Sequence, residues 1–149
     1  MIKKIVIYVL CLSVLFSQFS IAEEKFLSLK KSKVNVRYGP SFDSKIKYIY
    51  KKINLPIKQI DQKENFRRIV DLKNNSGWIH ISQVKKSNSI IILEDKILYK
   101  KPSNFSKPIA KLEKGRLLIL KKCENIWCNV KTEDYSGWVK TKNIWGSVN

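Results

Sequence analysis

The chain contains the phrase Ser76-Gly77-Trp78-Ile79 and, sixty residues later, its counterpart Ser136-Gly137-Trp138-Val139. Each copy follows an aromatic residue that opens a short strand-forming run, Phe66 in the first half and Trp127 in the second. The spacing from that aromatic to the tryptophan is 78 − 66 = 12 residues in the first copy and 138 − 127 = 11 in the second. An internal repeat at this period predicts two similar structural units.

The N-terminal segment has the composition of a signal peptide. Lys3 and Lys4 are followed by a largely apolar run from Ile5 to Phe16, and Ser20-Ile21-Ala22 places small residues before a cleavage point. An uncleaved membrane anchor is the alternative, but the apolar run is shorter than the roughly 20 residues that span a bilayer. We therefore expect residues 1–22 to be removed and the protein to be exported, to the periplasm or the cell exterior.

Cleavage would leave 149 − 22 = 127 residues, which the repeat divides into residues 23–86 and 87–149. A unit of about 60 residues buries only about 60% of its unfolded surface and is marginally stable by itself. We expect the two units to dock against each other. The stretch Lys85-Lys86-Ser87-Asn88-Ser89 is predicted to be a short polar linker between them.

Short alternating or β-branched runs, separated by turn residues, recur along both halves, whereas few segments keep a helical period. Five or so short strands in 60 residues, with a long first loop and tight hairpins, predict a small antiparallel barrel. The fold class expected is all-β, with two tandem barrels. The expected strands cover residues 26–29, 34–36, 46–50, 55–60, 66–72, 77–81, 90–93, 97–99, 109–112, 116–121, 127–131 and 137–140.

The run Val34-Asn35-Val36-Arg37-Tyr38-Gly39-Pro40 resembles the V-N-x-R-x-G-P opening of bacterial SH3-like (SH3b) domains. The second half is similar to the companion repeat of a two-domain exported SH3-like family, through Trp127-Cys128-Asn129-Val130 and Ile144-Trp145-Gly146. Three departures concern the ligand rather than the fold. Phe66 stands where tryptophan is usual, Ser41-Phe42 replaces the usual Gly-Thr-like turn, and the second repeat lacks the N-x-R-x-G-P run. The resemblance covers the whole chain after the signal peptide and implies an SH3-like barrel in each half.

Two of the three cysteines, Cys123 and Cys128, remain after removal of Cys11 with the signal peptide. In an oxidising compartment their even number favours a disulfide across a four-residue hairpin loop. A redox-active pair and two free buried thiols are the alternatives, and the Cys-x-x-Cys spacing of thioredoxin-like proteins is absent.

The formal charge is +18 for the full chain, which suits an anionic partner such as acidic glycan or lipid headgroups. Of the 30 basic residues, 26 are lysine and only four are arginine, and the lysines are scattered. Readers of nucleic acid favour arginine for its planar fork, so we expect no nucleic-acid partner. Drift toward AT-rich codons, which also favour isoleucine and asparagine, explains the lysine content equally well.

The residues offer little catalytic chemistry, and we expect no enzyme, no cofactor and no metal site. His80 is the one histidine, and a half-buried structural role in a strand is its simplest interpretation. A zinc site needs three or four clustered ligands. The neighbouring carboxylates Glu94 and Asp95 would point to opposite faces of a strand and could not flank a glycosidic bond.

Recognition remains, and the SH3-like resemblance implies a groove between the long first loop and the opposite hairpin loops. Aromatic residues at these places suit extended peptides and sugars, and basic residues beside them disfavour the proline-rich ligands of eukaryotic SH3 domains. Trp78 and Trp138 are interpreted as packing residues of each barrel's closing strand. The candidate groove residues are Tyr38, Phe42, Tyr48 and Phe66 in the first unit, and Tyr99, Phe105 and Trp127 in the second.

These features predict an exported, non-enzymatic binding module for cell-envelope material, with peptidoglycan as the leading ligand. Two alternatives are a scaffold that docks an envelope protein through the same groove, and electrostatic adsorption to an anionic lipid surface.

Overall fold

The computed structural model describes residues 24–148 and consists of two antiparallel sheets, one per repeat. The predicted signal peptide lies outside the described residues. No helix among the described residues is long and apolar enough to cross a membrane.

The first sheet contains β1 (Phe26–Leu29), β2 (Val34–Arg37), β3 (Ile46–Tyr50), β4 (Pro56–Lys63), β5 (Phe66–Val70), β6 (Ser76–His80) and β7 (Val84–Lys86), with the 3-10 helix η2 (Ile81–Gln83) before β7. The second contains β8 (Ser89–Ile92), β9 (Lys96–Tyr99), β10 (Pro108–Leu112), β11 (Leu117–Glu124), β12 (Trp127–Lys131), β13 (Ser136–Lys140) and β14 (Ile144–Trp145).

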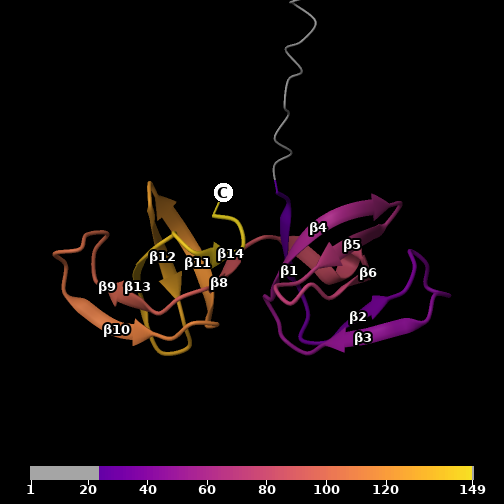
Figure 1. Ribbon diagram of the computed structural model, residues 1–149, viewed down its shortest axis with the longest axis horizontal. Coiled ribbons are helices and arrows are strands. Elements are labelled where there is room, and N and C mark those ends of the chain that lie inside the picture. Colours follow the sequence, from indigo (N-terminus) through magenta and orange to yellow (C-terminus); the bar gives the residue numbers. More distant parts are fainter. Residues whose placement is uncertain (1–23, 149) are drawn as a thin grey trace, which may run out of the picture.

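Both sheets have the same strand order, β3-β2-β6-β5-β4-β1-β7 and β10-β9-β13-β12-β11-β8-β14. Each strand of the second sheet corresponds to the first-sheet strand numbered seven lower. Figure 1 shows the two units side by side, with the second unit on the left and the first on the right. The predicted all-β fold of two tandem SH3-like units is confirmed.

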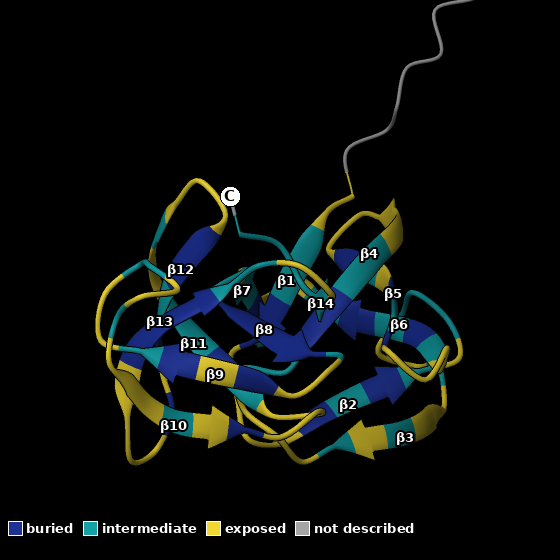
Figure 2. Ribbon diagram, turned by 60° about the vertical axis from the view of Figure 1, so that its left-hand side comes forward, coloured by how far each residue is buried: buried dark blue, intermediate teal, exposed yellow. Residues whose placement is uncertain are grey.

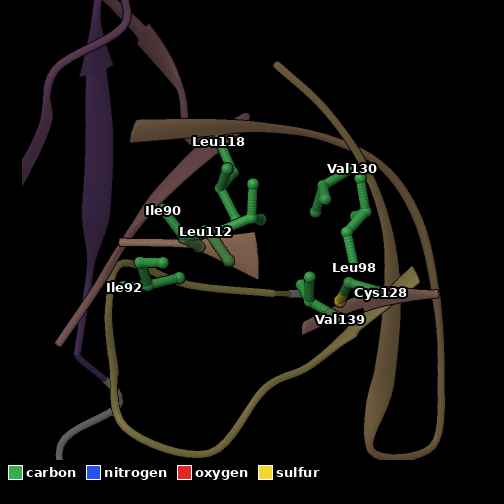
Figure 3. Close-up of a cluster of buried hydrophobic side chains, with 8 residues drawn as sticks. All are labelled: Ile90, Ile92, Leu98, Leu112, Leu118, Cys128, Val130 and Val139. Atoms are coloured by element: carbon green, nitrogen blue, oxygen red, sulfur yellow. The ribbon is translucent and has the colours of Figure 1, made fainter. Parts of the chain in front are cut away.

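Each unit has its own hydrophobic core. In the first, Leu29, Val34, Val36, Ile57, Ile69, Ile79 and Val84 form the buried cluster. In the second, the cluster consists of Ile90, Ile92, Leu98, Leu112, Leu118, Cys128, Val130 and Val139 (Figure 3). Alternate residues of most strands enter these clusters, as the period of a β-strand requires. Most loops and hairpin tips are exposed or half-buried, as Figure 2 shows in yellow and teal.

The Ser-Gly-Trp strands β6 and β13 are central in their sheets, not the closing strands that the sequence suggested. β6 lies between β2 and β5, and β13 between β9 and β12. A Cβ atom on Gly77 would lie 2.4 Å from a methyl carbon of Val36, and one on Gly137 would lie 2.6 Å from the Tyr99 carbonyl oxygen. The glycine of each phrase is therefore required because the neighbouring strand passes close to its backbone.

The last strands of the two units, β7 and β14, were missed by the sequence interpretation. β7 pairs with β1 and includes two residues assigned above to the linker, Lys85 and Lys86. β14 pairs with β8 through two residues, Ile144 and Trp145. Both are too short, and β7 too polar, to give a strand pattern, so their pairing is decided by the neighbouring strand. Only Ser87 and Asn88 connect the sheets.

The two units are docked through a small polar and aromatic contact. The hydroxyls of Ser28 and Ser89 are buried and lie 2.8 Å apart. The indole Nε1 of Trp145 donates to the Pro56 carbonyl oxygen at 3.0 Å, and the Trp145 ring meets the Phe26 ring edge-on at 5.2 Å. These contacts join β8 and β14 of the second unit to β1 and β4 of the first.

Candidate functional site

The long β2–β3 loop of the first unit is held in place by Arg37. Its Nη1 donates to the carbonyl oxygens of Phe42, at 2.9 Å, and Ser44, at 2.7 Å. A Cβ on Gly39 would lie 2.7 Å from the Ser44 hydroxyl oxygen, so glycine allows the two sides of the loop to approach. The V-N-x-R-x-G-P run thus builds a loop of defined shape, with its arginine bonded to the loop's own carbonyl groups.

The loop places Phe42 on an aromatic cluster at one end of the sheet. The Phe42 ring lies 5.2 Å from the ring of Phe66 and 4.9 Å from that of His80. Phe66 is almost completely buried, whereas Phe42 remains 60% exposed. His80 Nδ1 also lies 2.8 Å from the Ser82 hydroxyl and accepts from the Ser82 amide, which caps η2. His80 therefore has a structural role, while its ring forms part of the exposed face.

Beside this cluster, the outer face of the sheet contains a hollow of about 100 Å³. Trp78 of β6 is paired with Arg37 of β2 on one side and with Arg68 of β5 on the other. Directly paired residues of antiparallel strands share a face, so both guanidinium groups flank the indole. The hollow is lined by Arg37, Tyr38, Lys47, Arg68, Ser76, Gly77 and Trp78.

The hollow is rich in hydrogen-bond donors, and no carboxylate lines it. Lys47 Nζ donates to the Ser76 carbonyl oxygen at 2.9 Å and lies 5.6 Å from the centre of the Tyr38 ring. The guanidinium of Arg68 makes no hydrogen bond, ion pair or ring contact within residues 24–148. The hollow therefore concentrates positive charge, and one of its cations, Arg68, has no partner among the described residues.

The equivalent face of the second unit has a different composition. Tyr99 occupies the register position of Arg37, and Asn129 that of Arg68, because each pairs with Trp138. The ring of Tyr99 meets that of Trp127 edge-on at 5.7 Å. Lysine ammonium groups cover both tryptophans, Lys140 over Trp127 at 5.5 Å and Lys122 over Trp138 at 5.1 Å. Both tryptophans are only 8% exposed, so their rings are covered by neighbouring side chains.

Phe105, in the β9–β10 loop, is fully exposed, unlike Phe42 in the corresponding loop of the first unit. The second loop lacks an arginine anchor, since Tyr99 stands at the position of Arg37. Local bonds shape it instead: the Lys101 amide donates to the Ser106 hydroxyl, and the Phe105 amide to the Ser103 hydroxyl. These bonds leave Phe105 projecting away from Trp127.

Tyr48 lies on the opposite face of the sheet from Tyr38 and Phe42. It pairs with Val36, which belongs to the core, and its hydroxyl lies 3.4 Å from that of Tyr50. The Tyr50 hydroxyl donates in turn to the Asp71 carboxylate at 2.9 Å. Burial raises the pKa of Tyr48, and more strongly that of Tyr50. The structure thus separates Tyr48 from the other groove residues, because β3 directs it inward.

A larger hollow in the second unit, of about 210 Å³, is lined partly by acidic residues whose charges are already compensated. Glu94 accepts from Asn143 and from Lys96, and these bonds lower its pKa. The pKa of Asp95 is lowered by the hydrogen bond from the Lys114 amide and by Lys111. Carboxylates thus lie beside the lysines that line the larger hollow, whereas no carboxylate lines the smaller one.

Cys123 and Cys128 form a disulfide. They are directly paired across β11 and β12, with Cα atoms 4.1 Å apart. The intervening hairpin turn is tighter than the four-residue loop expected, since Glu124 and Trp127 also pair and Asn125 adopts a positive φ of 52°. The disulfide lies at the hairpin's end, with Cys128 in the core.

Of the predicted groove residues, the structure places Tyr38, Phe42 and Phe66 on or next to one exposed face. Arg68, on the same face, was not among the predicted residues, and Trp78 was assigned to packing. Trp78 is partly exposed and follows buried Gly77 by one residue, so its side chain points outward. The period of two along β6 could have revealed this, but its pairing with Arg68 depends on register. No group of three histidine, cysteine or carboxylate side chains that could hold a metal ion exists within residues 24–148.

Comparison with known families and structures is informative about the fold. The family model described as bacterial SH3 domain matches residues 30–86 and 95–146. Among solved structures, NlpC2 from Trichomonas vaginalis is similar at 10% identity and a TM-score of 0.39, covering 86% of this chain and 50% of that one. NlpC1 from the same organism is similar at 10% identity and a TM-score of 0.38, covering 90% and 50%. The chain thus spans half the length of each. No curated protein matches it.

Proposed function

Because this chain belongs to the bacterial SH3 domain family, we propose that it is an exported, non-enzymatic module that binds cell-envelope material, with peptidoglycan as its ligand. One observation carries the proposal: the outer face of the first unit combines exposed aromatic side chains with a hollow lined by three cationic side chains. Tyr38 is 66% exposed at its edge, Trp78 forms its floor, and Arg68 is unpaired within the described residues.

Peptidoglycan matches this face in two respects. Its sugars present apolar ring faces, which pack on aromatic side chains, and its stem peptides end in carboxylates, which cations bind. The alternation of these groups along a polymer suits an open, shallow face better than a deep pocket. A partner of this kind also agrees with the strongly positive net charge of the chain.

The non-enzymatic part of the proposal follows from how the reactive side chains are used. His80 caps η2, and the cysteines of the second unit are bonded to each other. Of the carboxylates near the larger hollow, Glu94 is paired with Lys96 and Asp95 with Lys111. A general base or nucleophile needs a free, suitably placed group.

Co-sedimentation with purified sacculi tests the proposal. We expect the protein to pellet with sacculi at low salt, and Tyr38→Ala to reduce the bound fraction severalfold. Tyr135→Ala is the matched control, since Tyr135 is 48% exposed on the second unit and lies outside the hollow. Failure of the unaltered protein to pellet would reject peptidoglycan as the ligand.

A second candidate function is docking to an envelope protein or to an anionic lipid surface, and the exposure of Phe105 favours it. A fully exposed phenylalanine in a loop that also contains Lys100, Lys101 and Lys107 can insert among lipid chains while the lysines contact headgroups. Flotation with vesicles of phosphatidylglycerol, compared with phosphatidylcholine, tests the lipid. Crosslinking and pull-down test a protein partner. Phe105→Ser should abolish either interaction and leave sacculus binding unchanged.

A further inference from the structure

We infer that the hollow beside Trp78 is a binding site for one oxyanion group, a carboxylate or a phosphate, and that only the first of the two units has it. Arg68 is the principal residue that binds the oxyanion, and Trp78 and Tyr38 line the same hollow. The inference deepens the proposed function and rests on it only for the natural source of the oxyanion.

The position of Arg68 supports an oxyanion site in the first unit. Arg68 is exposed, so its guanidinium retains its hydration and its five donor groups, and no described side chain neutralises it. Its cross-strand partner is Trp78, and the planar fork of a guanidinium binds an oxyanion through two parallel hydrogen bonds. An oxyanion bound there would complete a site that the protein leaves open.

The neighbouring groups add to the same positive field. Arg37 is fixed by its two bonds to the loop carbonyls, and both bonds use Nη1, so its remaining N–H groups are available to a ligand. Lys47 is held by its bond to the Ser76 carbonyl oxygen, on the same hollow. Because these cations are positioned by the fold, binding an anion costs little further side-chain ordering.

The same register in the second unit shows why the site occurs once. There Asn129 faces Trp138 in place of Arg68, and Tyr99 stands in place of Arg37. Neither can provide a charged fork. Two lysines of this face, Lys122 and Lys140, lie over the rings of Trp138 and Trp127. We therefore expect one oxyanion per chain, although the fold is repeated.

A nuclear magnetic resonance titration of the ¹⁵N-labelled protein tests both the oxyanion site in the first unit and its absence from the second. The ligands are acetyl-alanyl-alanine, its methyl ester and inorganic phosphate, each added at constant ionic strength. We expect the free carboxylate or the phosphate to shift the Trp78 indole resonance saturably and to leave that of Trp138 unchanged. The methyl ester should bind at least about tenfold more weakly, because it cannot form charge-assisted bonds. A preference for the dipeptide would indicate a peptide carboxylate, and a preference for phosphate a lipid or polymer phosphate.

Arg68→Ala should weaken binding at least about tenfold, and Arg68→Lys should restore only part of it. Arg116→Ala is the matched control: it removes the same charge from an exposed position in the second unit and should change affinity by less than about twofold. Equal binding of the ester, equal shifts at Trp78 and Trp138, or equal losses in the Arg68 and Arg116 variants would each overturn the inference.

Sacculus binding separates this inference from the proposed function. If the protein shows the saturable shift at Trp78 but does not pellet with sacculi, the oxyanion site stands and peptidoglycan is rejected. If the protein pellets and Arg68→Ala pellets equally, peptidoglycan binding stands and the oxyanion site is rejected as its means of recognition.

Discussion

Arg37 is bonded to the backbone of Phe42 and lies 5.7 Å from the centre of the Phe42 ring. One arginine thus fixes both the path of the β2–β3 loop and the direction of its aromatic side chain. The second unit lacks this arginine, and its corresponding loop leaves Phe105 fully exposed. The difference between the two candidate faces begins with this one residue.

Replacing Arg37 should loosen the loop and release Phe42 from Phe66. Arg37→Ala removes two charge-assisted bonds to carbonyl oxygens, so we expect the free energy of unfolding to fall by about 1–3 kcal/mol. Urea denaturation measures the loss of stability. Nuclear Overhauser effects between the Phe42 and Phe66 rings show whether the loop keeps its position. Arg116→Ala should have neither effect. Intact ring contacts in Arg37→Ala would contradict this role.

The contact between the units should depend on Trp145. Trp145→Phe keeps an aromatic ring beside Phe26 but removes the Nε1 bond to the Pro56 carbonyl oxygen, which should cost about 0.5–1.5 kcal/mol. Because that bond joins the two units, we expect calorimetric unfolding to separate into two transitions. A single transition at an unchanged midpoint would show that the Nε1 bond does not couple them.

The disulfide should stabilise the second unit selectively. The double variant Cys123→Ala, Cys128→Ala should lose about 2 kcal/mol, since even a short closed loop restricts the unfolded chain. Chemical shifts of the first-unit core should not change. Mass analysis of the peptide containing both cysteines should give a value two hydrogens lower without reduction; two free thiols in that peptide would refute the bond.

Tyr50 should make the first unit sensitive to high pH. Burial, followed by the bonds to Tyr48 and Asp71, raises the pKa of the Tyr50 hydroxyl above its ordinary value of 10.0. Since the folded-state pKa is the higher one, the protonated hydroxyl contributes its full stabilisation below pH 10, and this is lost as the pH rises further. Denaturation across this range should show a falling free energy of unfolding.

Tyr50→Phe should flatten that decline, whereas Tyr135→Phe, on the second unit, should leave it unchanged. An identical decline in Tyr50→Phe would assign the alkaline sensitivity to the lysines instead.

Much of the fold could be predicted because it depends on local patterns. The runs at Phe26–Leu29, Ile46–Tyr50 and Trp127–Lys131 were predicted with the bounds that the structure has. Alternation along each strand also identified core positions such as Val34 and Val36. The strands β7 and β14 could not be predicted, because residues as polar as Lys85 become a strand only through pairing with β1.

The candidate site was only partly predictable. The sequence indicated which loops contain aromatic residues, and the missing N-x-R-x-G-P run distinguished the second half from the first, but neither showed which side chains share a face. Tyr48 was assigned to the groove because it is near Phe42 in sequence, whereas β3 turns it inward. Nothing near Arg68 in sequence connects it with Trp78.

The sequence by itself determined two antiparallel units and their hydrophobic cores, since apolar period and turn residues act over a few positions. The tertiary structure decided which side chains meet. Register sets Arg68 and Arg37 on either side of Trp78, and the same register sets Asn129 and Tyr99 beside Trp138. A shift of one residue would turn every side chain of a strand to the other face. The difference between a tryptophan flanked by two arginines and one covered by a lysine therefore exists only after the strands have paired.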